Sequence, residues 1–169
     1  PDRKRYTNSP LPSYKFISGK TMSTNSDSQK SHIPELPEME QVFGPDNWMN
    51  SQRYLYAVDL FNYAFWWETH EVLEKLWLGT GRISPTAIFI QGIIQIAAAL
   101  LKNSQGISRG SQNLCAKGLP KVRSQSGLFL GIDIEQFTHE LEAYFSGEIV
   151  DLPQIVLNGI GTVDEIKIK

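Results

Sequence analysis

The central part of the chain places its apolar residues three and four positions apart, as amphipathic helices do. This spacing predicts one helix over residues 52–61 and a second over residues 66–78. Asn62 follows the first helix and is expected to end it in the left-handed conformation that asparagine tolerates. Because the connection is short, the two helices are expected to lie side by side as a hairpin.

Three further helices are predicted over residues 85–103, 108–122 and 134–146, the first of them apolar almost all round. Their boundaries carry ordinary capping signals. The capping residues are Ser84, Asp133 and Gly147. The pattern therefore predicts an all-α fold, a small helical bundle of two antiparallel helical hairpins plus a C-terminal helix. Gly92 is expected to let two of these helices approach closely.

Outside residues 48–147, which are predicted to form the bundle, the helical period is lost. Residues 1–47 are rich in Ser, Pro, Asn and Lys and are expected to be a disordered leader. Three apolar residues are expected to dock the end of this leader on the bundle: Leu36, Met39 and Phe43. Residues 148–169 are expected to form an extended C-terminal tail.

The location of the protein is predicted from its leader and its cysteine. The leader lacks the apolar segment of a secretory signal, and Met22 is expected as a natural initiator. The chain has a single cysteine, Cys115, which excludes an internal disulfide and is typical of a reducing compartment. Cys115 is expected to be a buried core residue and not a nucleophile. A cytoplasmic location follows, or the plastid stroma if the basic leader is a transit peptide.

Charge and hydropathy exclude two classes of partner. Residues 1–30 carry six basic and two acidic groups, which leaves ten basic and sixteen acidic groups for the rest of the chain. An acidic body is not typical of proteins that bind nucleic acid. The longest apolar stretch, residues 87–101, is too short to cross a bilayer, so no membrane partner is expected.

The most unusual segment is FWWETHEVLEKLW, residues 65–77, which has three tryptophans, one histidine and three glutamates. On a helix, one arc collects the side chains expected in the core. Its members are Trp66, Thr69, Leu73, Leu76 and Trp77. Glu68, Glu71 and Lys75 fall opposite, on the expected solvent side, and His70 and Glu74 fall on the border. Trp67 lies away from the apolar arc.

Two glutamines, Gln91 and Gln95, share the narrow polar stripe of the helix predicted over residues 85–103. A helix that is otherwise apolar must be central in the bundle. Buried amides need hydrogen-bond partners. Both glutamines are therefore expected to meet partners inside the bundle.

The ordered segments FNYAFWWETHEVLEKLW, FIQGIIQIAAALLK, NSQGISRGSQNL and GIDIEQF resemble the domain of unknown function 309 family over about residues 52–145. The matching positions are Phe61, Asn62, Glu68, His70, Glu71, Glu74, Trp77, Gln91, Gly92, Gln95, Ala97 and Ala98. Ala64 departs from the family's turn glycine and Thr69 from a small residue. The resemblance implies a small all-α bundle of bacteria, archaea and plastids, for which a tentative metal-dependent hydrolase label is sometimes used.

Three interpretations of the polar cluster remain open on the sequence. In the first, His70 and Glu74, one helical turn apart, hold a divalent metal, and Glu71 acts as general base. A third ligand is not evident, because His32 lies in the leader and His139 in the last helix. In the second, the cluster is a closed hydrogen-bonded network. In the third, it opens into a pocket with aromatic walls.

The leading prediction is a non-catalytic binding or scaffold module, and the alternative is a metal-dependent hydrolase. The predicted binding cluster consists of Asn62, Glu68, His70, Glu74, Trp66, Trp67, Trp77, Gln91 and Gln95. No cofactor is expected, and a divalent metal belongs only to the hydrolase alternative. The predicted partner is a small molecule or a protein, with homo-oligomer formation as a further option.

Overall fold

The structure is a computed structural model that describes residues 3–15, 33–39 and 41–166. In these ranges it is mostly helical, with one very short two-stranded sheet, which confirms the predicted all-α class. The elements in chain order are η1 (Trp48–Asn50), α1 (Gln52–Asn62), α2 (Trp66–Gly79), α3 (Pro85–Ser104), α4 (Ser108–Val122), β1 (Leu128–Phe129), β2 (Ile132–Asp133), α5 (Ile134–Ser146) and α6 (Val163–Ile166).

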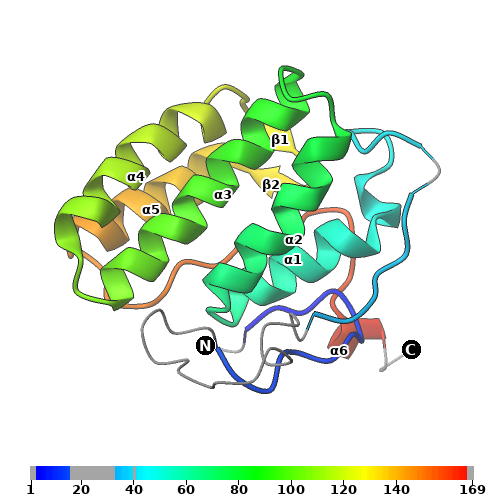
Figure 1. The fold of residues 1–169 in the computed structure, drawn as a ribbon, viewed down its shortest axis with the longest axis horizontal. Helices are drawn as coiled ribbons and strands as arrows, with labels where there is room; N and C mark the ends of the chain where they lie inside the picture. The colour runs from blue at the N-terminus through cyan, green and yellow to red at the C-terminus, as the bar shows by residue number, and fades with distance from the viewer. Residues whose placement is uncertain (1–2, 16–32, 40, 167–169) are drawn as a thin grey trace, which may run out of the picture.

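The helices pack mainly on their neighbours in the sequence. Helix α1 packs on α2, α2 on α3, and α3 on α4, so that α3 lies between α2 and α4 (Figure 1). Helix α5 contacts α4 and lies behind α3 and α4 in this view. The arrangement gives the two predicted hairpins, α1–α2 and α3–α4, and the predicted C-terminal helix.

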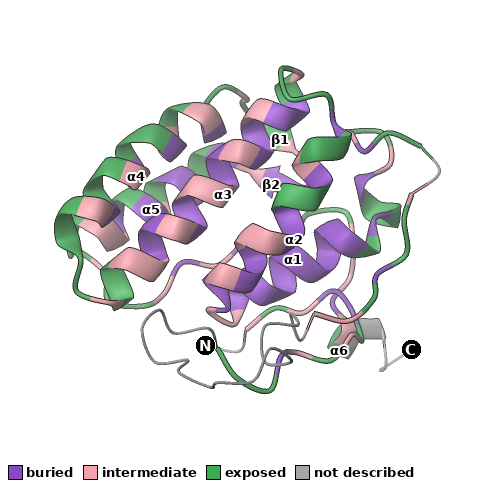
Figure 2. Ribbon diagram, in the orientation of Figure 1, coloured by how far each residue is buried: buried purple, intermediate pink, exposed green. Residues whose placement is uncertain are grey.

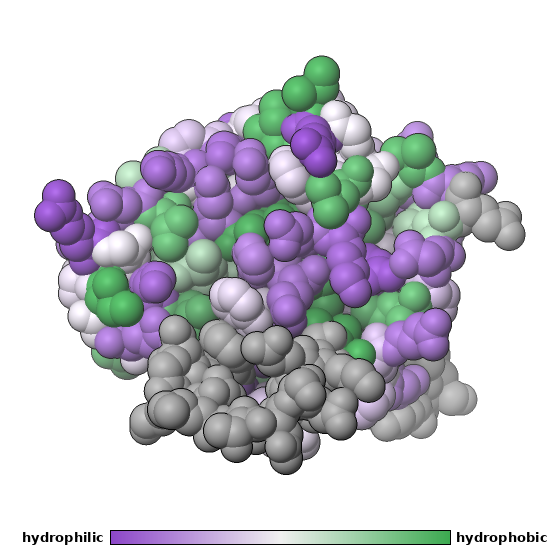
Figure 3. Space-filling model, viewed as in Figure 1, coloured by the Kyte–Doolittle hydropathy of each residue, from purple (hydrophilic) through white to green (hydrophobic). Residues whose placement is uncertain are grey.

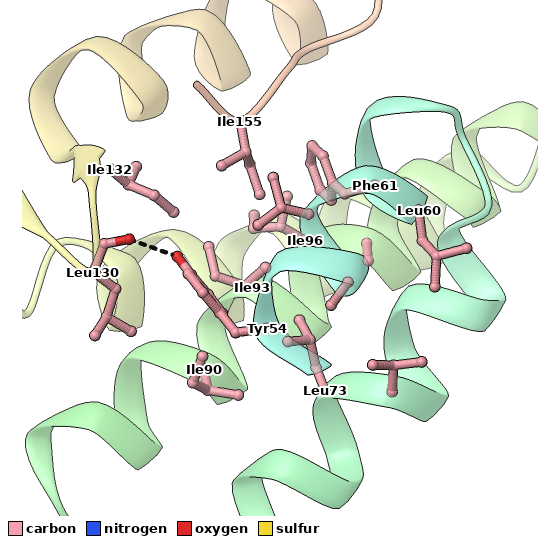
Figure 4. Close-up of a cluster of buried hydrophobic side chains, with 14 of the residues drawn as sticks. Tyr54, Leu60, Phe61, Leu73, Ile90, Ile93, Ile96, Leu130, Ile132 and Ile155 are labelled. Atoms are coloured by element: carbon pink, nitrogen blue, oxygen red, sulfur yellow. Dashed lines mark hydrogen bonds between the residues drawn. The ribbon is translucent and has the colours of Figure 1, made fainter. Parts of the chain in front are cut away.

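The core is centred on α1 and α3, which are the most buried helices (Figure 2). Tyr54 of α1 reaches Leu130 in the β1–β2 turn, where its hydroxyl donates a hydrogen bond of 2.8 Å to the backbone carbonyl (Figure 4). Ile93 and Ile96 of α3 face the same cluster. Burial of each such side chain contributes roughly 1.5–3 kcal/mol.

Helix α3 is long and apolar enough to meet the length and composition test for a membrane span, but 56% of its most apolar window is buried inside the protein. A buried core helix passes the same test. Its partner α4 approaches closely, because a Cβ added at Gly92 would lie 2.9 Å from the backbone nitrogen of Val122. This contact confirms the expected role of Gly92.

The capping signals act as expected. The Ser84 hydroxyl accepts a hydrogen bond of 3.1 Å from the Ala87 N–H, and Asp133 accepts one of 3.0 Å from the Gln136 N–H. Gly147 ends α5 with a φ of 81°. Each cap satisfies a backbone group that the helix itself leaves unpaired.

The β1–β2 hairpin is an element that the helical pattern does not predict. Leu130 and Gly131 form its two-residue loop with φ values of 48° and 79°, the conformation of a type I′ turn. Glycine is required at the second position by space as well, because a Cβ there would lie 2.5 Å from the ring of Trp48. Leucine tolerates the first position because its side chain is buried in the core.

The prediction for Asn62 is wrong. Asn62 is the last residue of α1 and has a negative φ, whereas Ala64 takes the left-handed conformation, with a φ of 61°. The turn after α1 thus takes left-handed geometry at an alanine. Asn62 is fully buried and serves another purpose.

The Asn62 side chain joins two segments that are far apart in the sequence. Its amide nitrogen donates to the carbonyls of Lys4, at 3.1 Å, and Ile155, at 3.0 Å. Its amide oxygen accepts a hydrogen bond of 2.7 Å from the Ile155 N–H. One turn earlier, Asp59 accepts hydrogen bonds from the backbone N–H groups of Tyr6 and Thr7, at 2.6 and 3.0 Å.

Burial raises the pKa of Asp59, and the hydrogen bonds from Thr7 and Tyr6 oppose that rise. The Thr7 hydroxyl also donates to this carboxylate at 2.6 Å, and the Arg5 Nε lies 3.6 Å from it. Residues 3–15 of the predicted leader therefore lie against α1. A buried carboxylate needs hydrogen-bond donors, and this segment supplies them.

The end of the predicted leader also packs on the bundle. Leu36 and Phe43 are buried, and Met39 packs against the same core, which confirms their expected docking. Met22 and His32 lie outside the described residues. Residues 148–162 are extended apart from short turns and one bridge between Leu157 and Ile132. The division into leader, bundle and tail stays a prediction.

Replacing Asn62 with alanine is expected to lower the free energy of unfolding by about 2–4 kcal/mol, because it leaves backbone groups of Lys4 and Ile155 without partners. Urea unfolding monitored by circular dichroism measures the change. Asn103→Ala is the matched control, since Asn103 is exposed and bonds only the Tyr144 hydroxyl at 3.3 Å. A loss in Asn62→Ala no larger than in the control would contradict the role of Asn62.

Candidate functional site

The predicted core arc of α2 is largely confirmed. Thr69, Leu73 and Leu76 are buried, as is Trp66, whereas Trp77 is half-buried. This arc packs on α1 on one side and on α3 on the other. The burial pattern therefore fixes which way the remaining side chains of α2 point.

Fewer side chains of α2 are exposed to solvent than predicted. Glu74 and Lys75 are exposed and Glu71 is half-buried, but Glu68 is only 8% exposed. The prediction of a solvent position for Glu68 is wrong because the leader covers this end of α2. The charge of Glu68 acts on Lys15 of the leader, where it opposes the lowering of the Lys15 pKa by burial and by Arg3.

Trp67 and His70 form a stacked pair on the half-buried edge of α2. Their ring centroids are 5.5 Å apart and their planes make an angle of 29°. Near the other end of the helix, the Arg82 guanidinium lies 5.7 Å from the centre of the Trp77 ring, within cation–π range. Three of the four tryptophans of the chain thus lie on this helix.

Three ring nitrogens on α2 are buried and have no hydrogen-bond partner among the described residues: Trp66 Nε1, His70 Nδ1 and Trp77 Nε1. Residues 66, 70 and 77 fall within about 40° of one another at 100° per residue, so they form one line along the helix. An indole N–H can only donate. Each buried polar group without a partner costs about 1–3 kcal/mol, and in a native protein such a group calls for a hydrogen-bond partner, which for the two indoles is an acceptor.

The predicted network of His70 and Glu74 with Gln91 and Gln95 is not formed. Within the described ranges, no hydrogen bond joins either α2 residue to either glutamine. The Gln95 amide oxygen instead accepts a hydrogen bond of 3.0 Å from the Lys121 ammonium of α4. Gln95 therefore has its partner on the opposite side of α3 from α2, which explains why the network does not close.

Asn62 is also not part of the cluster. Its side-chain hydrogen bonds go to Lys4 and Ile155. The candidate site that remains is a set of ring-bearing residues on α2, and Gln91 is half-buried on the neighbouring helix α3. We call this set the α2 ring cluster; it comprises Trp66, Trp67, His70 and Trp77.

The residues present do not fit a complete metal site. In the part of the chain that the structure describes, no group of three or more His, Cys, Asp or Glu side chains is placed to hold a metal ion. His70 and Glu74 thus supply two ligands at most, whereas catalytic zinc usually takes three from the protein. Metal binding by His70 and Glu74 stays a prediction.

Glu71 has an electrostatic property that its sequence position does not reveal. Burial raises the pKa of the Glu71 carboxyl, the Glu68 carboxylate adds to the rise, and His70 and Lys75 oppose it. The buried position of Glu68 thus changes the chemistry of its neighbour. A raised carboxyl pKa is common at functional sites but also arises in structural clusters.

The sequence pattern does not identify two contacts of the predicted site residues, that of Lys121 with Gln95 and that of Arg82 with the Trp77 ring. Lys121 lies on α4, and only the packing of α3 on α4 places it beside Gln95. The glycines of α3 and α4 were the available sequence signal for this helix contact, because a Cβ at Gly118 would lie 3.0 Å from the Gly92 carbonyl oxygen. Arg82 follows α2 in a turn whose conformation, with a φ of 58°, is unusual for arginine.

Fold and site define a small all-α bundle in which an aromatic and histidine-bearing helix lies beside a central apolar helix. Residues 54–114, which run from the first turn of α1 into α4, match the family model described as "Domain of unknown function (DUF309)". This match confirms the resemblance indicated by the motifs of α2 and α3. No curated protein matches the chain. The family match carries no specific catalytic or binding role.

Glu71→Gln is expected to raise the melting temperature at pH 7. A carboxyl with a raised folded-state pKa contributes stability that is full below the unfolded-state pKa and is lost as pH rises through the folded-state value. The gain of the variant over wild type should therefore shrink as pH falls to 4. Thermal melts between pH 4 and 8 measure it.

Glu74→Gln is the control, because it removes the same charge from an exposed position on the same helix. It is expected to gain less than Glu71→Gln at pH 7. Equal gains from both variants would show that the overall acidity of α2, and not the burial of Glu71, is responsible.

Proposed function

We propose that this domain is a non-catalytic binding module whose α2 ring cluster takes a ligand rich in hydrogen-bond acceptors. The observation that supports this proposal is the set of three buried ring nitrogens without partners among the described residues, at Trp66, His70 and Trp77. Two of the three groups can only donate, so their partner must supply oxygen acceptors. Carboxylates and peptide carbonyls are ligands of this kind.

The surroundings of these nitrogens also favour a ligand. Trp67 and His70 present a stacked pair of rings at a half-buried edge, and Gln91 is half-buried on the neighbouring helix. Aromatic walls with a few polar groups are typical of small-molecule and peptide sites. The three nitrogens are themselves buried, so a ligand that bonds them must displace the side chains that cover them.

The indole N–H signals in proton–nitrogen NMR spectra provide the test. Short acetylated peptides and small dicarboxylates are titrated into the full chain, and the signals are assigned with Trp66→Phe and Trp77→Phe. A ligand that bonds the ring cluster is expected to shift the Trp66 and Trp77 signals downfield. Trp48, whose ring lies against Tyr54 and Gly131 outside α2, is the internal control.

His70→Ala should abolish these shifts while the Trp48 signal keeps its position. Shifts that persist in His70→Ala, or that appear equally at Trp48, would count against binding at the ring cluster. If none of the probes shifts Trp66 or Trp77, and both N–H groups exchange rapidly with solvent, ordered water is their acceptor and the proposal fails.

The alternative function is a metal-dependent hydrolase with His70 and Glu74 as ligands and Glu71 as general base. The raised pKa of Glu71 favours it, because a general base works best when its pKa lies near the working pH. The shortage of a third ligand in the described ranges speaks against it. The binding proposal therefore takes precedence.

Protein purified without a histidine tag is expected to contain no stoichiometric metal by elemental analysis. Zinc or manganese should raise the melting temperature of the wild type no more than that of His70→Ala. One equivalent of bound metal, together with a metal-dependent rise in melting temperature that His70→Ala loses, would reverse the order of the two functions.

A further inference from the structure

The net charge of -2 hides a strong separation of charge along the chain. Between Lys75 and Ile132 there are seven basic residues and no acidic residue, so the rest of the chain carries nine basic and eighteen acidic residues. The seven are Lys75, Arg82, Lys102, Arg109, Lys117, Lys121 and Arg123. Five of these lie in the α3–α4 hairpin or directly after it, which makes that hairpin the basic part of an acidic protein.

The exposed face of α4 has an unusual composition. Its exposed residues are Ser108, Arg109, Gln112, Asn113, Ala116, Lys117 and Pro120. None of them is acidic, and none is a large apolar residue. The apolar side of α4 packs instead on α3, where Cys115, Gly118 and Val122 are buried.

Neighbouring elements add charge to this face and neutralise little of it. The Lys102 stem of α3 passes the start of α4, because a Cβ at Gly110 would lie 3.7 Å from it. Lys121 is half-buried and donates to Gln95, a neutral partner. Arg123 pairs with Glu142 of α5 at 2.7 Å. In the described ranges, the other four cations of the hairpin form no ion pair.

The chemistry of the face selects among polyanionic partners. A helix that lies in an anionic membrane surface inserts apolar side chains into the lipid, and a protein interface has apolar or aromatic anchors at its centre. The exposed face of α4 offers neither. Contacts to nucleic-acid phosphates are made by arginine, lysine, serine, asparagine and glutamine, which are the residue types found here.

We propose that the exposed face of α4, flanked by Lys102 and Lys121, binds the phosphate backbone of a nucleic-acid duplex. From Arg109 to Lys121 the helix extends about 18 Å. Measured along the duplex axis, that length corresponds to about five phosphates of one strand. No aromatic side chain is exposed on α4 to stack on single-stranded bases, so a duplex is favoured over a single strand.

This inference is independent of the α2 ring cluster, and it revises an expectation drawn from total charge. The acidic body of the chain argues against nucleic-acid binding only if the charges are mixed on the surface. Here the α3–α4 hairpin is free of acids. The acidic remainder should keep binding weak, confined to one face and insensitive to base sequence.

Fluorescence anisotropy of a labelled 20-base-pair duplex, in DNA and RNA forms, tests the proposal with the full chain. Wild type is expected to bind at 50 mM NaCl and to lose roughly fiftyfold in affinity at 200 mM, as neutralisation of three phosphates requires. Arg109→Glu/Lys117→Glu should bind at least tenfold more weakly than wild type. Both positions are exposed, and circular dichroism shows whether the variant keeps its fold.

Lys4→Glu/Lys75→Glu is the matched control, because it makes the same change in net charge at exposed positions outside the hairpin. It should keep its affinity within about threefold of wild type. Equal losses in the two variants would overturn the proposal in favour of diffuse attraction. So would the absence of duplex binding at 50 mM NaCl, or binding to phosphatidylserine vesicles with none to the duplex.

Discussion

The rest of the structure depends on two fully buried polar side chains in the last turns of α1, Asp59 and Asn62. A carboxylate in an apolar interior is costly unless donors surround it. The backbone N–H groups of Tyr6 and Thr7 and the Thr7 hydroxyl supply those donors, and the Arg5 side chain lies beside the carboxylate, so this segment must follow α1. Asn62 binds the C-terminal segment at Ile155. A buried amide needs acceptors for its NH₂ group and a donor for its oxygen, and the backbone of Ile155 offers both. Two residues thus decide the course of both ends of the chain.

This constraint extends to the candidate site. Once the leader lies against α1, it covers one edge of α2 and buries Glu68, which was expected in solvent. The carboxylate of Glu68 then raises the pKa of Glu71. The opposite edge of α2 carries the Trp67–His70 stack. Figure 3 shows that polar side chains cover much of the face on which α2, α3 and α4 lie, with apolar residues between them. The two edges of α2 therefore have different chemical environments.

How much of the fold the sequence predicts depends on how far apart in the sequence the interacting residues lie. Helix caps such as Ser84 and Asp133 act within three residues, so the pattern is sufficient to place them. The all-α class and the order of the hairpins rest on local periodicity in the same way. Asn62 was misassigned because its local reading, a left-handed cap, is reasonable, and its actual partner lies 93 residues away. Long-range polar pairing leaves no periodic signal.

The candidate site shows the same limit. The helical arc of α2 correctly separates Leu73 from Glu74, because that separation depends on one helix alone. Whether Gln95 faces His70 or Lys121 depends on which helix packs on which side of α3, and one sequence contains no direct record of that choice. The type I′ turn at Leu130 and Gly131 was missed because leucine is not a residue that normally indicates positive φ.

The long-range hydrogen bonds of the Asn62 side chain have a consequence for the order of folding. Contacts between helices that follow one another in the sequence form over short loops, and chains rich in such contacts fold fast. The bundle from α1 to α4 is built in this way. Bonds from Asn62 to Ile155, and from the Leu157 N–H to the Tyr6 hydroxyl, span 93 and 151 residues. Because closing such long loops costs more entropy, the helical hairpins should assemble first and the two end segments should close over them last.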